Sequence, residues 1–463
     1  MDLNKILEGY KKDIVRSVQE LVRIESVRGV PAEGKPYGEG PHQALSYVMD
    51  LCRKLGIEAK NLDGQVCFAR YGEGGRMLAI LVHLDVVPAG DGWDVPPFEG
   101  VIRNGAIYGR GTCDDKGPAI AALYALRAVM DTGCPFKNEV RIIFGCDEES
   151  GQNLDIAYYK GKERAPDFGF SPDSAYPVIN AEKGILHATL TKKPCAGGKG
   201  IRILSMQAGK AVNIVPGECL VSLSCPGMED ELMHMLEEAA RKQSTVISMQ
   251  KSRGTVLLQV LGSSAHASRP EDGVNAISHS FLLLSTLPLA GGHNEDAVRA
   301  LAEKIGLTQH GENIGLDITD KPTGRLTLNP GMLAADGNGF VLKIDIRYPA
   351  AASGEFIQSA LEAAFSEKFE VAVVQNLDPH YVPEDNTDIR TLLDVYERHT
   401  GLPGYCYGVG GGTYAREFSC GVAFGPYLPG EKHLSHMANE HISIKSLMLN
   451  ARLMAHAIMR LSI

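Results

Sequence analysis

The stretch Met77-Leu78-Ala79-Ile80-Leu81-Val82-His83-Leu84-Asp85 joins a continuous apolar run to a histidine and an aspartate. An unbroken run of this kind is typical of a β-strand that is covered on both faces, as in the sheet of an α/β domain. A second run, from Val140 to Cys146, is followed by Asp147-Glu148-Glu149. Between the two runs, Gly117-Pro118 opens a predicted helix, with proline in the first turn, where its missing N–H costs least. The sequence therefore predicts an α/β sheet whose strands end in polar side chains.

These polar side chains are of the kinds that bind cations. Ligands of open α/β sheets collect beyond the carboxyl ends of the strands, where His83 and Glu149 are expected to lie. Two more acidic segments, Asp114-Asp115 and Pro172-Asp173, occur in the same half of the chain, and His436 lies near its C-terminus. Each segment alone has an ordinary explanation, such as a surface turn or a solvated helix N-terminus. Carboxylates that converge in a buried site need a compensating positive charge, so their joint occurrence predicts a hydrolase with two bound metal ions.

The bulk composition disfavours several classes of partner. The chain of 463 residues is too long for one hydrophobic core, which predicts at least two domains. Its formal net charge of −10 and the lack of a Lys/Arg-rich run disfavour nucleic acid and anionic membranes as partners. No signal peptide and no apolar stretch of membrane-spanning length is visible, and the ten scattered cysteines form no CxxC pair. These features predict reduced thiols and a cytoplasmic location.

The pattern of elements changes after Glu182, which indicates an inserted domain. Residues 1–182 alternate helix and strand patterns and are predicted to form the first part of a catalytic α/β domain, which residues 382–463 complete. Residues 183–381 mix alternating strand patterns with amphipathic helices and are predicted to form an α+β lid domain. Because about 200 residues is long for one small α+β unit, two structurally similar halves are expected. Outside the first stretch, the predicted strands are 184–190, 254–261 and 340–347, and the predicted helices are 229–241, 353–364 and 389–399.

Five ordered motifs resemble those of the M20-family metallopeptidases, and the resemblance spans essentially the whole chain. Looser matches resemble the peptidase V-like dipeptidase branch of this family, among them 262–268, 326–331 and 410–416. The resemblance implies a zinc-peptidase-like catalytic domain and a lid built from two ferredoxin-like halves. The five motifs are His83-Leu84-Asp85-Val86-Val87-Pro88, Gly109-Arg110-Gly111-Thr112-Cys113-Asp114-Asp115-Lys116-Gly117, Asp147-Glu148-Glu149-Ser150-Gly151, Pro172-Asp173, and His436 in His436-Met437-Ala438-Asn439-Glu440.

The same resemblance implies a site with two divalent metal ions. Asp114 would bridge the ions, and the peptide that joins it to Asp115 is a candidate cis bond. Glu148 would be the general acid/base that handles a water held between the ions, and Asp85 would fix the tautomer of His83. The mixed nitrogen and oxygen ligands suit Zn²⁺, although carboxylate-rich sites also accept Mn²⁺ or Co²⁺. The implied ligands are His83, Asp114 and Asp173 for one ion, and Asp114, Glu149 and His436 for the other.

Residues of the predicted lid match further family positions. The resemblance implies that His266 and Asn213 stabilise the tetrahedral intermediate. It also implies that Arg347 binds the terminal carboxylate of the substrate, together with backbone N–H groups of a glycine-rich loop. The alternatives are that Arg347 only caps a strand, and that His266 is a core histidine whose hydrogen bonds are made within the protein. The residues of the loop are Gly411, Gly412 and Thr413.

The sequence therefore predicts a metal-dependent dipeptidase that encloses a small dipeptide between its two domains. An N-acyl-amino-acid amidohydrolase or a succinyl-diamino-acid desuccinylase of the same family is the alternative. Such an enzyme would use the same metal ions and differ only in its substrate pocket. A catalytically silent binding protein is disfavoured, because Glu148 is present together with all five implied ligands. In the family that the chain resembles, single-unit lids commonly pair two chains. A doubled lid would provide that partner surface within one chain, so the resemblance implies a monomer.

Overall fold

The computed structural model describes residues 2–463, and these residues divide into two compact units. Unit 1 comprises the chain up to Asn180, Tyr381–Tyr407 and Gly412–Ile463. Unit 2 comprises Ala181–His380 and Gly408–Gly411, so it is inserted into the sequence of unit 1. Gly408–Gly411 groups with unit 2, although the sequence placed it in the segment that completes the first domain.

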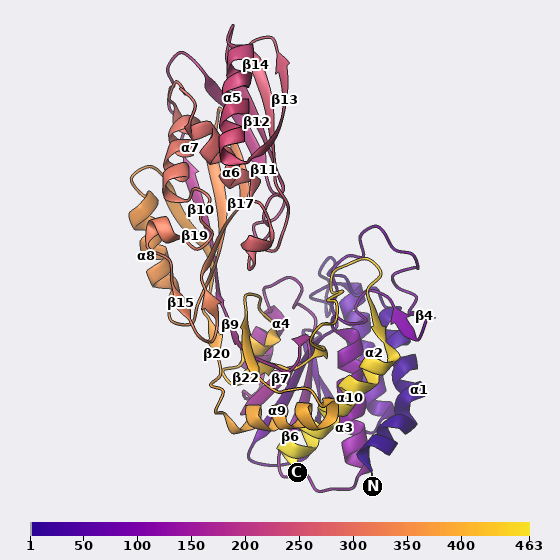
Figure 1. Cartoon of the computed structure of the whole chain (residues 1–463). Helices are drawn as coiled ribbons and strands as arrows, with labels where there is room; N and C mark the ends of the chain where they lie inside the picture. The colour runs from indigo at the N-terminus through magenta and orange to yellow at the C-terminus, as the bar shows by residue number, and fades with distance from the viewer. Residues whose placement is uncertain (1) are drawn as a thin grey trace. The chain divides into compact units, whose positions relative to one another are not determined.

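The sheet of unit 1 is mixed, with parallel strands at its centre (Figure 1). Strand β3 (Met77–His83) pairs in parallel with β6 (Glu139–Gly145) on one side and with β7 (Phe168–Ser171) on the other. The carboxyl ends of these neighbouring strands therefore lie at the same edge of the sheet. The strand order is β1-β2-β6-β3-β7-β22-β9-β20, with β21 paired to β9, and the remaining bounds are β1 (Glu58–Leu62), β2 (Val66–Tyr71), β9 (Val178–Glu182), β20 (His380–Tyr381), β21 (Cys406–Val409) and β22 (Gly421–Ala423).

Both faces of this sheet are covered, which explains the continuous apolar runs. Along β3, Leu78, Ile80 and Val82 pack into one hydrophobic core, whereas Ala79 and Leu81 pack into a second core on the other face. Alternate residues of a strand point to opposite faces, so a strand between two cores needs apolar residues at every position. The helices of unit 1 are α1 (Leu3–Val22), α2 (Glu39–Lys54), α3 (Lys116–Asp131), α4 (Leu154–Lys162), α9 (Thr387–Thr400) and α10 (Ile444–Ser462).

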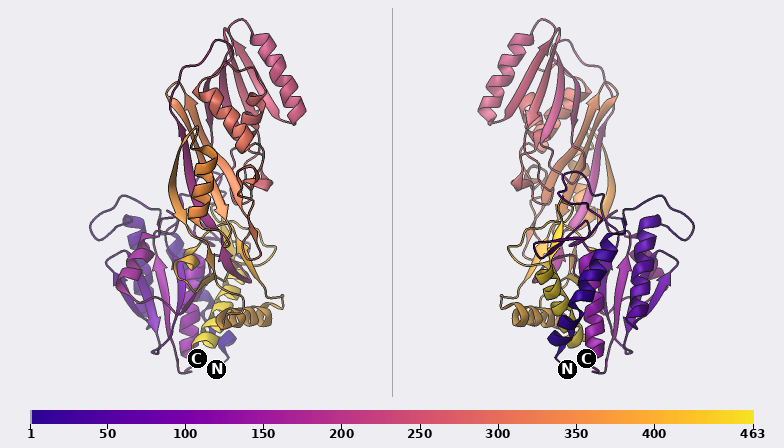
Figure 2. Two further views of the ribbon diagram at one scale, coloured as in Figure 1. Left: turned by 90° about the vertical axis from the view of Figure 1, so that its left-hand side faces the viewer. Right: turned by 90° about the vertical axis from the view of Figure 1, so that its right-hand side faces the viewer.

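Unit 2 is built on a single antiparallel sheet with helices on one face (Figure 2). Its strand order is β13-β14-β12-β11-β17-β18-β10-β19, and the pairing of β11 with β17 joins two halves into one sheet. At β12 and β14 the opposite face is open to solvent, with Leu220 49% and Leu257 47% exposed. The strands are β10 (Gly184–Lys192), β11 (Arg202–Ala208), β12 (Glu218–Ser224), β13 (Val246–Ser252), β14 (Thr255–Leu261), β17 (Thr327–Asp336), β18 (Gly339–Tyr348) and β19 (Glu370–Leu377), and the helices are α5 (Glu229–Gln243), α6 (Ala276–Ser285), α7 (His293–Lys304) and α8 (Gly354–Phe365).

The mixed α/β architecture confirms the predicted fold class, and short elements complete it. The predicted strands and helices correspond to β3, β6, β10, β14, β18, α3, α5, α8 and α9. Among residues 2–463, no helix is both long and apolar enough to cross a membrane. The short elements are β4 (Val101–Arg103), β5 (Ala106–Tyr108), β8 (Ser174–Ala175), β15 (Thr319–Asp320), β16 (Gly324–Arg325), β23 (Pro426–Tyr427), β24 (His441–Ser443), and the 3₁₀ turns η1 (Pro270–Asp272), η2 (Glu312–Ile314) and η3 (Tyr414–Glu417).

Candidate metal centre

Three of the predicted ligands lie at the carboxyl ends of the central parallel strands. His83 is the last residue of β3, Glu149 follows β6, and Asp173 follows β7. Because these strands are neighbours and parallel, their ends bring the three side chains together in unit 1. This position beyond the carboxyl ends of the strands is where open α/β sheets bind their ligands.

Two loops supply the other predicted ligands. Asp114 precedes α3, and the peptide bond between Asp114 and Asp115 is cis, as predicted. His436 lies between β23 and β24 with φ at 64°, a conformation that residues other than glycine adopt infrequently. The candidate site therefore draws on five segments of unit 1 that are far apart in the sequence.

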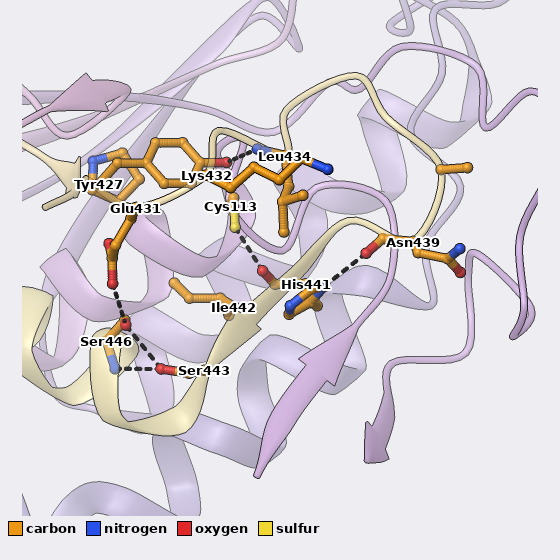
Figure 3. A pocket seen from close by; sticks show the side chains of 12 residues that line it. Cys113, Tyr427, Glu431, Lys432, Leu434, Asn439, His441, Ile442, Ser443 and Ser446 are labelled. Carbon is orange, nitrogen blue, oxygen red and sulfur yellow. Dashed lines mark hydrogen bonds between the residues drawn. The ribbon is translucent and has the colours of Figure 1, made fainter. Parts of the chain in front are cut away.

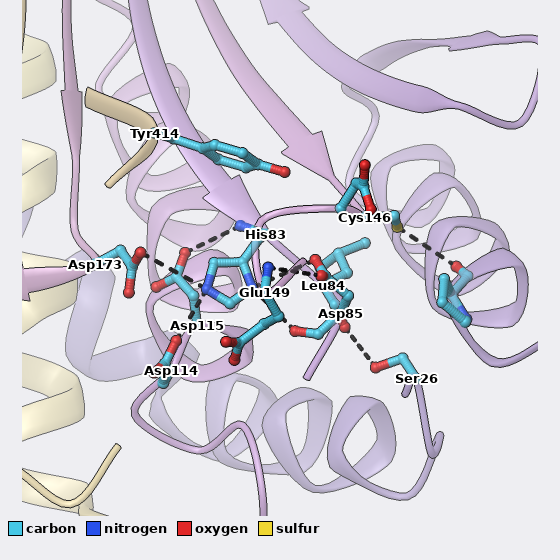
Figure 4. Close-up of polar contacts among 12 residues, drawn as sticks. Ser26, His83, Leu84, Asp85, Asp114, Asp115, Cys146, Glu149, Asp173 and Tyr414 are labelled. Carbon is cyan, nitrogen blue, oxygen red and sulfur yellow. Dashed lines mark hydrogen bonds and ion pairs between the residues drawn. The ribbon is translucent and has the colours of Figure 1, made fainter. Parts of the chain in front are cut away.

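Asp114 contacts both predicted histidine ligands, and Figure 4 shows it beside His83. Its Oδ1 is 2.9 Å from Nε2 of His83, and its Oδ2 is 3.2 Å from Nε2 of His436. Nε2 of His436 also lies 2.9 Å from Oε2 of Glu149, and Nε2 of His83 lies 3.7 Å from Oδ2 of Asp173. Each oxygen of Asp114 thus faces a different histidine, which is the disposition that a carboxylate needs to bridge two ions.

The donor atoms of this cluster fit divalent cations. Ligand atoms of His83, Asp114 and Glu149 lie within 4.8 Å of one another, and so do those of His83, Glu148 and Asp173. Among the described residues, acidic side chains in and around the cluster outnumber its two histidines, and Oδ1 of Asp115 is buried without a hydrogen-bond partner. Buried carboxylates in such excess require positive charge, which a bound cation provides. The acids are Asp85, Asp114, Asp115, Glu148, Glu149 and Asp173.

The pKa directions of the cluster reflect the same excess of negative charge. Hydrogen bonds to Asp114 and Glu149 raise the pKa of His436 to about 11. Burial opposes a charged His83, but hydrogen bonds to Asp114 and Asp173 outweigh it and raise the pKa of His83 well above its usual value. Burial and the charge of Asp114 raise the pKa of Asp173 to about 7, while burial and the charge of Asp173 raise the pKa of Glu148 well above its usual value.

Asp85 connects two of the predicted ligands. Nδ1 of His83 is 2.9 Å from the backbone oxygen of Asp85 and 3.6 Å from its Oδ1. The backbone N–H of Glu149 donates to Oδ2 of Asp85 at 3.1 Å. A hydrogen bond from Nδ1 of His83 leaves Nε2 as the coordinating atom, so the contacts of Asp85 suit the tautomer that a metal needs.

Tyr414 is a neighbour of the site to which the sequence analysis gave no role. Its ring packs edge-on against His83 (Figure 4), with ring centroids 6.1 Å apart. Its hydroxyl donates to the buried carboxylate of Asp155. Tyr414 belongs to the Gly410–Arg416 segment that carried part of the resemblance. The large aromatic side chain in that segment was the sequence feature that could have indicated a residue near the site.

A cavity of about 540 Å³ lies beside the loop that carries His436 (Figure 3). Its lining, all within the described part of the chain, includes Cys113 and His441 but not the predicted ligands. The thiol of Cys113 donates to the backbone oxygen of His441 at 3.0 Å, and burial raises the pKa of this thiol well above its usual value. Cys113 is therefore a poor nucleophile at neutral pH.

The predicted lid residues gather within unit 2. The N–H of Ala267 donates to the backbone oxygen of Asn213 at 2.9 Å, which places Asn213 beside the segment of His266. The backbone N–H of Ser268 donates to Nδ1 of His266 at 3.2 Å, and the hydroxyl of Ser268 lies 2.7 Å from the same nitrogen. An Nδ1 that accepts from this N–H belongs to the neutral tautomer with its proton on Nε2. Burial and then the charge of Arg347 lower the pKa of His266, which favours this neutral form.

Arg347 is held by two acceptors of unit 2. Its Nε and Nη2 donate to Asp345 at 2.7 and 2.8 Å, and its Nη1 donates to the backbone oxygen of Gly410 at 3.0 Å. Gly411 has open space where a side chain would stand, and Thr413 accepts the N–H of Ala415 at the start of η3. Gly411 groups with unit 2, whereas Gly412 and Thr413 group with unit 1. The predicted site residues thus form two groups, one in each unit.

The chain is similar to several known proteins over nearly its whole length. The model of "Peptidase family M20/M25/M40" matches residues 79–460. A Bacillus subtilis (strain 168) protein named "Putative dipeptidase YtjP" is 38% identical over 98% of both chains. The "Beta-Ala-Xaa dipeptidase" of Lactobacillus delbrueckii subsp. lactis is 32% identical over 100% of this chain and 99% of its own. The crystal structure of human carnosine dipeptidase 1 shares the fold, with a TM-score of 0.56 and 16% identity over 98% of both chains.

The protonation of the histidines predicts that metal binding releases protons. In the metal-free protein the raised pKa of His436, about 11 against an ordinary 6.5, stabilises the fold fully below pH 6.5, and this contribution is lost as the pH rises towards 11. If His436 coordinates a metal ion, the ion displaces this proton, and metal affinity should then rise with pH between these values. Calorimetric titration at pH 7.5 in buffers of different ionisation enthalpy should show net proton release.

His436→Ala should release fewer protons than the wild type. His433→Ala removes a nearby histidine that stacks on Tyr427 and should change nothing. Metal binding without any proton exchange would contradict the protonation described for this site.

Proposed function

The chain belongs to the peptidase family M20/M25/M40, and from this membership we propose that it is a metal-dependent dipeptidase that hydrolyses the peptide bond of small dipeptides. The sharing of Asp114 between His83 and His436 is the observation that carries this proposal. Support comes also from relatives named dipeptidases, which align with the chain over nearly its whole length. As a member of this family the protein is a metallopeptidase, and therefore a hydrolase.

The residues of the cluster would hold two ions that share Asp114. When bound, such ions polarise a carbonyl oxygen and lower the pKa of a bound water towards ~7. We propose Zn²⁺ as the preferred ion, because imidazole and carboxylate donors suit it, with Mn²⁺ or Co²⁺ as substitutes. The proposed ligands are His83, Asp114 and Asp173 for one ion, and Asp114, Glu149 and His436 for the other.

Glu148 is the proposed general acid/base. Burial and the charge of Asp173 raise the pKa of its carboxyl group, so this group accepts a proton more readily than an exposed glutamate does. Glu148 would take a proton from the attacking water and return it to the nitrogen of the leaving amine. Asp85 would keep His83 in the coordinating tautomer while this occurs.

The residues of unit 2 have proposed roles in binding. His266 would donate from Nε2 to the developing oxyanion, since its Nδ1 accepts from the backbone of Ser268. Asn213 would add a second donor. Arg347 would bind the terminal carboxylate with the N–H groups that Asp345 and Gly410 leave available. The backbone of Gly411, Gly412 and Thr413 would contribute further donors to the same carboxylate.

A substrate panel tests the proposed reaction. The enzyme is stripped of metal and assayed with L-dipeptides, β-alanyl dipeptides, N-acetyl amino acids and N-succinyl diamino acids, each before and after addition of Zn²⁺, Mn²⁺ or Co²⁺. Dipeptides should be cleaved only after metal is restored. Cleavage of the N-acyl compounds alone would overturn the dipeptidase assignment, and turnover by the metal-free protein would overturn metal dependence.

Variants should separate metal binding from turnover. Glu148→Gln should retain its metal and lose roughly 10²–10⁴-fold in kcat, because it removes a general acid/base. His266→Ala should lose roughly 10²–10³-fold in kcat at unchanged metal content. Arg347→Lys should mainly raise KM, because a lysine cannot grip a carboxylate with two parallel bonds. Metal content and steady-state kinetics provide the measurements.

Glu139→Gln is the matched control, because Glu139 pairs with Arg141 at the opposite end of β6. Full activity of Glu148→Gln would remove Glu148 from the mechanism.

We also propose that the protein acts as a monomer. The continuous sheet of unit 2, joined through β11 and β17, supports this, because two halves already pair within one chain. Sedimentation equilibrium should give the mass of one chain, 49.9 kDa, at micromolar concentration. A stable dimer would refute this proposal without affecting the proposed chemistry.

A further inference from the structure

A buried ion pair links two of the sequence motifs that contain metal ligands, although neither of its members is a proposed ligand. Nη1 of Arg110 donates to Oε2 of Glu440 at 2.8 Å, and the two residues are only 1% and 0% exposed. Arg110 lies four residues before Asp114, and Glu440 lies four residues after His436. Both residues belong to unit 1.

Glu440 holds the backbone that leads to Asp114. Its Oε2 accepts the N–H of Gly111 at 3.0 Å, and its Oε1 accepts the N–H of Cys113 at 2.8 Å and that of Asp114 at 3.3 Å. The backbone oxygen of Glu440 accepts the N–H of Gly109 at 2.9 Å. One acidic residue thus provides acceptors along the whole loop from Gly109 to Asp114.

Arg110 contacts the segments that carry the two proposed histidine ligands. Its Nη1 donates to the backbone oxygen of Met437, the residue after His436, at 3.3 Å. Its Nη2 donates to the backbone oxygen of Ala89 at 3.2 Å and lies 3.4 Å from that of Pro88, in the segment that follows His83. The guanidinium group also lies 5.4 Å from the centre of the Trp93 ring.

We propose that Arg110 and Glu440 are positioning residues of the metal centre, which fix the segments of His83, Asp114 and His436 relative to one another before any ion binds. This inference rests on the proposed metal-dependent function. The thiol of Cys113 adds a bond to the backbone of His441 in the same region (Figure 3).

The physical argument concerns the order of the unliganded site. The proposed ligands bring excess negative charge together, and all of them except His83 lie outside the helices and strands. Asp114 and His436 lie on the two loops that the ion pair joins. Without a second set of contacts these loops would separate, and each ion would have to reassemble its ligands on binding. Charge-assisted hydrogen bonds in a buried environment are strong and directional, so the ion pair keeps the ligands close to their binding geometry. Groups that orient metal ligands in this way typically contribute about 10–100-fold to metal affinity.

The experiment measures Co²⁺ binding by metal-free protein, without substrate. Wild type, Glu440→Gln and Arg110→Lys are titrated with Co²⁺ in competition with a chelator, and the visible spectrum of the bound ion is recorded. Glu440→Gln should raise the Kd for Co²⁺ on the order of 10–100-fold and alter the spectrum. Arg110→Lys should raise it as well, because an ammonium group cannot reproduce the fork of contacts to Glu440 and the carbonyl groups. Far-UV circular dichroism checks that each variant is folded.

Glu163→Gln is the matched control. Glu163 forms another largely buried pair of unit 1, 2.9 Å from Nη1 of Arg141, and contacts none of the proposed ligands among the described residues. This variant should bind Co²⁺ like the wild type. Wild-type affinity and spectrum in both Glu440→Gln and Arg110→Lys would overturn the inference, and so would an equal loss in Glu163→Gln.

Two further outcomes are also decisive. If Glu440→Gln does not fold, the affinity and spectrum of Arg110→Lys decide the question alone. If the wild type itself binds no Co²⁺, the proposed function fails and the inference fails with it. The titration contains no substrate. Its result therefore does not depend on whether the substrate is a dipeptide.

Discussion

The carboxylate of Asp114 faces two histidines that enter the site from opposite ends of the sequence, and the rest of unit 1 serves to hold it there. One oxygen contacts His83 and the other contacts His436. Such an arrangement is costly in a buried site unless cations offset the surrounding acids. Bound cations would relieve this cost more fully than the protons that the acids and histidines hold in the metal-free protein. The pKa shifts of His436 and Asp173 are two expressions of this single constraint.

Two features of unit 1 position the proposed ligands: the central sheet and a buried ion pair between two loops. His83 is the last residue of β3 and is fixed by a sheet that is buried on both faces, whereas Glu149 and Asp173 lie in the short segments that follow β6 and β7 in the same sheet. The segments of Asp114 and His436 do not follow strands of this sheet, and a buried ion pair between Arg110 and Glu440 joins them to each other. The sheet and the ion pair thus position different segments of the same site.

Much of this organisation was predictable because it depends on local patterns. The unbroken apolar runs of β3 and β6, and the ligand-type residues directly after them, predicted both the strands and the site. The helix α6 was not predicted, since it is buried on most sides and lacks an amphipathic pattern. The joining of β11 to β17 depends on tertiary pairing that no local pattern reveals. Arg110 and Glu440 stood within the quoted motifs, but nothing in either segment indicated that they pair with each other.

The central claim is that Asp114 bridges two ions, and the most direct measurement is a crystal structure of the enzyme with Zn²⁺, recorded at the zinc absorption edge. The account predicts two anomalous peaks in unit 1, one on each side of Asp114, the first beside His83 and Asp173 and the second beside Glu149 and His436. A single peak, or peaks that leave Asp114 without contact to both ions, would contradict it.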